Sequence, residues 1–116
     1  MEVFFEARDP ESAKLRDLTL MRARFALRRV VWLVPTVKVR LSDADRSRGA
    51  TDKSDKYCRV EVQTHGRGAV IVQTRARNWR TALDNALSRA ARLLLRAIRR
   101  FDAGRRSRRP ALDFRP

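Results

Sequence analysis

The sequence has little of the side-chain chemistry that disulfides and metal sites require. It contains one cysteine, Cys58, and one histidine, His65, among 116 residues. A single cysteine forms no intramolecular disulfide, and this usage fits a reducing compartment, so we expect a cytoplasmic protein. One histidine and one cysteine also fall short of the usual ligand set of a zinc site. The sequence therefore predicts neither a metal nor any other cofactor.

Carboxylates are also scarce, with 13 Asp and Glu against 28 Lys and Arg. They lie mostly in predicted loops and at helix ends, so no pair is placed for general acid–base work. No serine, cysteine or lysine has a recognisable activating context. The segment Gly66–Gly68 lacks the third glycine and the strand-to-helix context of a dinucleotide-binding loop, and we interpret it as a hairpin turn. The sequence therefore predicts a protein that is not an enzyme and has no small-molecule substrate.

Long apolar runs are absent as well. The most apolar stretch, Val30–Pro35, is far shorter than the roughly 20 residues that span a bilayer. The N-terminus carries Glu2 and Glu6 and has no basic segment followed by an apolar one, so no signal peptide is predicted. We therefore do not expect a membrane protein.

Positive charge, by contrast, is abundant, and the formal net charge is +15. Such an excess repels itself unless the working partner is an anion, which makes nucleic acid the first candidate and an anionic membrane surface the second. Nearly all of the basic residues are arginines. This choice fits bidentate phosphate contacts, and it fits a GC-rich genome equally well.

Strand patterns occur at four places in the chain. The four segments are apolar and aromatic or alternate apolar with polar residues: Met1–Ala7, Thr36–Ser42, Lys56–Thr64 and Ala69–Arg75. The turn at Gly66–Gly68 joins the last two into a hairpin. The polar segment Asp43–Asp55 is predicted to be a mobile loop.

Two segments show the spacing of helices. The first begins at Pro10, with Asp9 as its cap, and runs to about Val31. The second runs from Asn78, its cap, to Phe101. The resulting order, β-α-β-β-β-α, predicts an α+β two-layer sandwich. Its four-stranded mixed sheet has both helices on one face and water on the other.

A row of arginines follows the second predicted helix. Four of them recur at steps of three, four and three residues: Arg89, Arg92, Arg96 and Arg99. This spacing puts them on one face, over roughly 15 Å of helix. Asp84 is the only acidic residue between Asn78 and Phe101, whereas surface helices normally mix both signs. We therefore interpret the row as an anion-binding surface rather than an ordinary solvated face. The first predicted helix adds four more arginines: Arg22, Arg24, Arg28 and Arg29.

Aromatic residues are weaker candidates for contact with bases. Trp32 and Trp79 lie at helix ends, where a single tryptophan is predicted to pack, with base stacking as the alternative. Tyr57 is predicted to lie on the sheet surface. The aromatic side chains therefore do not by themselves indicate base recognition.

Three segments carry a resemblance to a known family. The most specific is Trp79–Asp84, followed by Ala86, Leu87 and Arg89, which parallels the opening of that family's last helix. Two further matches involve its third strand and its opening strand and helix: Lys56–Val62, and Glu2–Arg8 with Ser12–Arg16. Over roughly residues 1–101 the chain is similar to the ribosome hibernation-promoting factors, also called ribosome-associated inhibitors or ribosomal subunit interface proteins.

The resemblance implies a fold like that of double-stranded-RNA-binding domains, together with a definite function. Members of this family bind the small ribosomal subunit at the decoding channel, overlap the sites of messenger and transfer RNA, and silence idle ribosomes. Basic side chains of both helices face ribosomal RNA (rRNA). Carried over by position, the rRNA-binding residues are Arg22, Arg28, Arg29, Arg89, Arg92 and Arg96. Helical spacing adds Arg99.

The chain also departs from the family. Phe25 and Leu95 stand where members often have polar or basic residues. Residues 1–101 are predicted to form the ribosome-binding domain, and residues 102–116 a basic, disordered tail. The chain ends near where long members begin a dimerisation domain, so we expect a short form without it.

Two other functions stay open. One is general binding of double-stranded RNA or DNA, and the other is a basic interaction module for an acidic protein or membrane surface.

Overall fold

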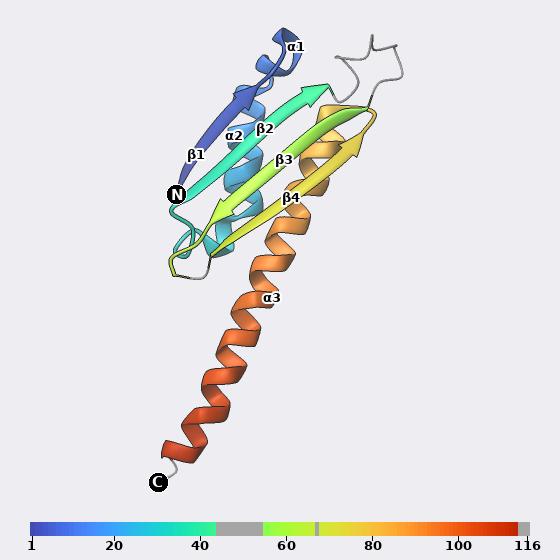
Figure 1. Cartoon of the computed structure of the whole chain (residues 1–116). Coiled ribbons are helices and arrows are strands. Elements are labelled where there is room, and N and C mark those ends of the chain that lie inside the picture. The colour runs from blue at the N-terminus through green and yellow to red at the C-terminus, as the bar shows by residue number, and fades with distance from the viewer. Residues whose placement is uncertain (44–54, 67, 114–116) are drawn as a thin grey trace.

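Four strands form one mixed sheet, as the sequence predicts. A computed structural model of the chain describes residues 1–43, 55–66 and 68–113, with side chains through Arg100. The strands are β1 (Glu2–Ala7), β2 (Thr36–Asp43), β3 (Lys56–Gln63) and β4 (Ala69–Ala76), adjacent in that order. β1 pairs with β2 in parallel, and the other two pairs are antiparallel (Figure 1). The loop predicted at residues 43–55 lies largely outside the described residues.

The turn between β3 and β4 explains the position of its glycines. Gly66 and Gly68 have φ angles of 74° and 80°, a region that glycine enters at no steric cost. The Thr64 hydroxyl and amide both donate to the Gly68 carbonyl oxygen, at 2.6 and 3.0 Å. These bonds close the hairpin that the sequence predicts.

The helices lie on one face of the sheet, which confirms the two-layer α+β sandwich (Figure 1). They are α1 (Pro10–Ala13), α2 (Arg16–Ala26), the 3₁₀ turn η1 (Arg28–Val30) and α3 (Trp79–Asp113). α2 packs beside β1, and α3 packs over β3 and β4. As a result α2 and α3 contact each other across the helix layer.

The prediction of a single long first helix is wrong, because the segment forms three shorter helices, α1, α2 and η1. The Asp9 cap is present, since its carboxylate accepts from the Ser12 amide at 2.9 Å. The Leu15 amide then donates to the Ser12 carbonyl, an i→i+3 bond that ends α1. Beyond α2, the buried residues Leu27, Val30 and Leu33 follow one another every third residue. That period matches the three residues per turn of a 3₁₀ helix.

The predicted end of the last helix at Phe101 is also wrong. α3 continues to Asp113 and projects beyond the sheet (Figure 1), so most of the predicted disordered tail is helical. Arginine is among the better helix formers, whereas in a helix interior a glycine, here Gly104, costs about 1 kcal/mol and a proline, here Pro110, costs about 3 kcal/mol. The division of the chain into a ribosome-binding domain, residues 1–101, and a basic tail, residues 102–116, stays a prediction.

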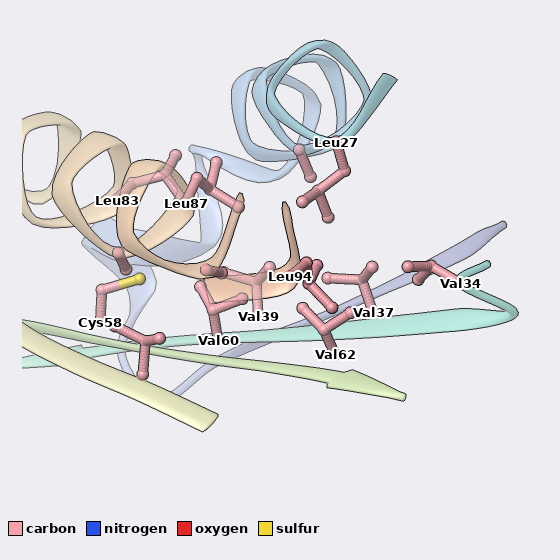
Figure 2. Packing of buried hydrophobic residues seen from close by; sticks show 14 of the residues in the cluster. Leu27, Val34, Val37, Val39, Cys58, Val60, Val62, Leu83, Leu87 and Leu94 are labelled. Atoms are coloured by element: carbon pink, nitrogen blue, oxygen red, sulfur yellow. The ribbon is translucent and has the colours of Figure 1, made fainter. Parts of the chain in front are cut away.

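The core fills the space between the two layers. Inward residues of adjacent strands pair in register, Val37 with Val62 and Val39 with Val60, and all four are buried. Leu83, Leu87 and Leu94 of α3 meet them from the helix layer (Figure 2). The outward residues between them, such as Lys38 and Glu61, form the open face of the sheet.

Cys58 lies in this core beneath Leu83 (Figure 2). Burial raises the pKa of its thiol from the ordinary value of 9.0 to about 12. The folded protein therefore holds this proton more tightly than the unfolded chain. The resulting stability is fully present below pH 9.0 and is lost as the pH rises to about 12.

We expect this loss to appear in the pH dependence of unfolding. Between pH 9 and 12, the free energy of unfolding of the wild type should fall by up to about 1.4 kcal/mol per pH unit more than that of Cys58→Ala. Urea titrations at several pH values measure both slopes. Equal slopes for the two proteins would show that the thiol is not protected by burial.

Candidate nucleic-acid interface

The start of α3 is capped by one side-chain hydrogen bond and fixed to the sheet by two others. The Asn78 side chain accepts from the Thr81 amide at 2.8 Å, which confirms the predicted cap. The Trp79 indole donates to the Ser42 carbonyl at 3.1 Å, and the Thr74 hydroxyl of β4 donates to the Ala82 carbonyl at 2.6 Å. These contacts fix the rotation of the helix, and so they decide which of its side chains face water.

The predicted arginine row lies on the exposed side of α3. Ala90 and Leu94 point into the core, with 0% and 1% of their surface exposed. The four arginines of the row are all exposed: Arg89, Arg92, Arg96 and Arg99. Arg28 and Arg29 are exposed too, but they lie on the 3₁₀ turn η1 and not on the face of an α-helix. We call these six residues, together with Arg22, the arginine surface.

Arg22 differs from the other predicted site residues because it is held in an ion pair. Its Nη1 atom donates to both carboxylate oxygens of Asp84 at 2.8 Å, which joins α2 to α3. The two side chains keep 37% and 45% of their surface exposed. Asp84, the one acidic residue of the predicted helix, therefore neutralises an arginine of the neighbouring helix.

We expect this ion pair to contribute modestly to stability. A double-mutant cycle with Arg22→Met and Asp84→Asn should give a coupling energy of about 0.2–1 kcal/mol, because both groups are partly in water. Urea unfolding at low and at high salt measures the coupling energy, which should shrink at high salt. A coupling energy well above this range, and insensitive to salt, would contradict the partial exposure of the pair.

Two grooves border α3 and bring some of the predicted arginines together. The α2–α3 groove, about 490 Å³, is lined by Arg22, Arg28 and Arg92 among others. The β4–α3 groove, about 590 Å³, is lined by polar side chains that include Arg89 and Arg92. Arg92 thus belongs to both grooves. Arg29, Arg96 and Arg99 line neither of them.

The β4–α3 groove contains polar residues that the sequence analysis did not single out. They are Gln73, Arg75, Asn85 and Ser88. Alternation along β4 indicates that Gln73 and Arg75 are on one face of the strand. No local pattern in the sequence, however, indicates that β4 lies beside the turn of α3 that carries Asn85 and Ser88. Their guanidinium, amide and hydroxyl groups are donors suited to phosphate oxygens.

The two tryptophans have different environments. Trp79 is half-buried and packs, with Lys56 Nζ 4.7 Å from its ring centre. Trp32, also predicted to pack, is 62% exposed, and its indole donates to the Arg29 carbonyl at 3.1 Å. The prediction for Trp32 is therefore wrong. η1 turns the chain at the end of α2, and the core uses Leu33 and Val34 instead.

The open face of the sheet has a different electrostatic character. There Arg40 pairs with Glu6 at 2.9 Å, and Arg59 lies 3.6 Å from Glu61. Both signs alternate on this face, as they do on ordinary protein surfaces. The unbalanced positive charge of the described residues is therefore concentrated on the helix layer.

Other kinds of site find little support among the described residues. In residues 1–43, 55–66 and 68–113, no group of three or more His, Cys, Asp or Glu side chains is placed to hold a metal ion. Within the same ranges, no helix is both long and apolar enough to cross a bilayer.

Comparison with known proteins shows the fold. The N-terminal domain of Protein Y from Thermus thermophilus superposes with a TM-score of 0.64 at 19% identity, covering 83% of this chain and 98% of that one. A ribosomal subunit interface protein from Coxiella burnetii superposes with a TM-score of 0.60 at 12% identity, covering 84% and 97%. Both belong to the ribosome hibernation factor family, so the fold that the resemblance implies is confirmed. No protein-family model and no curated protein matches the sequence.

Proposed function

We propose that this chain binds the small ribosomal subunit at the decoding channel and silences translation in idle ribosomes. The arginine surface contacts phosphates of the rRNA, with Arg92 at its centre. Binding there blocks messenger and transfer RNA without any catalytic step or cofactor, and it takes place in the cytoplasm.

One observation carries this proposal. The helix layer carries a row of exposed arginines, Arg89 to Arg99, on a fold shared with a ribosomal subunit interface protein. A phosphate backbone is a ligand that relieves the repulsion within such a row, since each arginine that neutralises a phosphate also releases counterions. The mixed charges of the open sheet face offer no comparable attraction.

Two other functions give different results in the same kind of assay. A general binder of double-stranded RNA or DNA has similar affinity for arbitrary duplexes, with a steep dependence on salt. A module for an acidic protein or a membrane surface keeps its partner after nuclease treatment. The arginine row suits all three, and the shared fold favours the ribosome.

Co-sedimentation with purified small subunits tests the proposal. At physiological salt we expect the chain to move with the small subunit in a sucrose gradient and to be displaced by messenger and transfer RNA together. Random RNA duplexes in equal mass are the control competitor. Absence of binding, or equal displacement by the duplexes, would reject the proposal.

A further inference from the structure

The α2–α3 groove contains an exposed aromatic ring that the proposed phosphate contacts do not use. Phe25 lines the groove and keeps 66% of its surface exposed. The sequence resemblance already identifies this position as unusual, because family members often have a polar or basic residue there. Single exposed apolar side chains are common on protein surfaces, but this ring lies in a groove beside two exposed arginines, Arg28 and Arg92.

Arg28 is held against this ring. Its guanidinium carbon lies 4.1 Å from the centre of the Phe25 ring, and its Nη1 atom donates to the Phe25 carbonyl at 2.7 Å. The hydrogen bond and the cation–π contact together restrict the arginine, so its remaining donors are positioned beside the ring before any ligand arrives. Across the groove, Arg92 supplies a second exposed guanidinium.

The rest of the groove suits the edge of a base. The half-exposed Arg22–Asp84 pair and Ser88 line it with donors and acceptors. Its volume of about 490 Å³ lies within the range of about 300–1,000 Å³ that is typical of sites for small organic ligands. Ala26, Leu87 and Ala91 complete the lining with apolar surface. An aromatic ring flanked by arginines, with apolar surface and a few polar groups beside it, is the kind of surface with which proteins bind unpaired nucleotides.

We propose that the α2–α3 groove binds one unpaired nucleotide of the RNA. Its base stacks on the face of the Phe25 ring opposite Arg28, and its phosphate is held by Arg28 and Arg92. This inference rests on the proposed function in that the RNA is ribosomal. A paired nucleotide does not fit the site, because bases within a duplex are stacked on their neighbours and the major groove of A-form RNA is too narrow for side chains. The chain therefore recognises a base as well as the backbone.

Three RNA hairpins separate a base contact from phosphate contacts. One has a single-nucleotide bulge, the second has the same bulge without its base, and the third is fully paired. The first two carry the same phosphates. The wild type should bind the base-bearing bulge about fivefold to a hundredfold more tightly than the abasic one, as stacking on one aromatic side chain provides.

Two variants at one position locate the contact. Phe25→Leu should lose the discrimination between the first two hairpins, whereas Phe25→Tyr should retain it. The position is exposed, and circular dichroism checks that each variant is folded. Equal binding of the base-bearing and abasic hairpins by the wild type overturns the proposal, as does no binding to either. Full discrimination by Phe25→Leu also overturns it.

The outcomes for this site and for the proposed function are separable. Wild-type protein that sediments with small subunits but ignores the base refutes only the nucleotide site. Protein that discriminates the base but does not bind small subunits refutes the ribosomal function and leaves the nucleotide site intact. If the groove binds an acidic peptide instead of a nucleotide, the protein should sediment with small subunits without discriminating the base.

Discussion

Reversing two charges of the arginine row should abolish binding to the small subunit while leaving the protein folded. In Arg92→Glu with Arg96→Glu, two exposed guanidinium groups become carboxylates that repel phosphates. We expect the affinity to fall by about a hundredfold or more. Arg92 is the more sensitive of the two positions because it borders both grooves beside α3. Co-sedimentation and a filter-binding titration measure the loss.

A matched variant separates the position of the charges from their number. Lys14→Glu with Lys38→Glu makes the same change in net charge at two exposed positions outside the arginine surface. It should bind nearly as the wild type does. For the milder Arg92→Gln with Arg96→Gln, the slope of log affinity against log salt should fall by about two, one unit for each lost phosphate contact. If the two charge-reversal variants bind equally weakly, net charge alone attracts the RNA, and the arginine surface is not the contact.

Shortening Leu87 to alanine should have the largest effect on stability. Leu87 is 1% exposed and lies on the side of α3 that faces α2 (Figure 2). Removing its side chain leaves a cavity between the two helices, at a cost of about 2–5 kcal/mol. For a domain of this size the melting temperature should fall by roughly 10–30 °C. Thermal unfolding followed by circular dichroism measures the change.

Met21→Ala is the control for this prediction. It also removes a large apolar side chain from a helix, but Met21 is 62% exposed on α2. We expect its free energy of unfolding to stay within about 0.5 kcal/mol of the wild type. If both variants lost the same free energy of unfolding, the helices would not have the orientation described here, in which Leu87 is buried and the arginine row is exposed.

The sheet was predictable from the sequence because its pattern is local. Alternation along Thr36–Ser42 and Lys56–Thr64 defines which residues face inward, and register then follows from pairing those residues. The first helix was not predictable in the same way. Apolar residues there permit a continuous helix, and only the need to bury Leu27, Val30 and Leu33 together makes the 3₁₀ turn preferable. That need arises from the tertiary packing.

In the candidate site too, the features that follow a local pattern were predictable, and those that depend on tertiary contacts were not. Helical spacing identified the row from Arg89 to Arg99 because all its members lie on one element. The ion pair between Arg22 and Asp84 joins residues 62 positions apart, and no local pattern indicates it. The exposure of Trp32 was missed for a related reason. A tryptophan at a helix end is compatible with packing, but η1 turns the chain there and the core uses Leu33 and Val34 instead.

Density for the chain bound to the small subunit would show directly which surface of the chain contacts rRNA. We expect α2, η1 and α3 to face rRNA in the decoding channel, with Arg92 and Arg96 within hydrogen-bonding distance of phosphate oxygens. We also expect the open face of the sheet, with Lys38 and Glu61, to point away from the RNA. A complex in which the sheet face contacts the rRNA, or in which the chain lies outside the decoding channel, would contradict the proposed function.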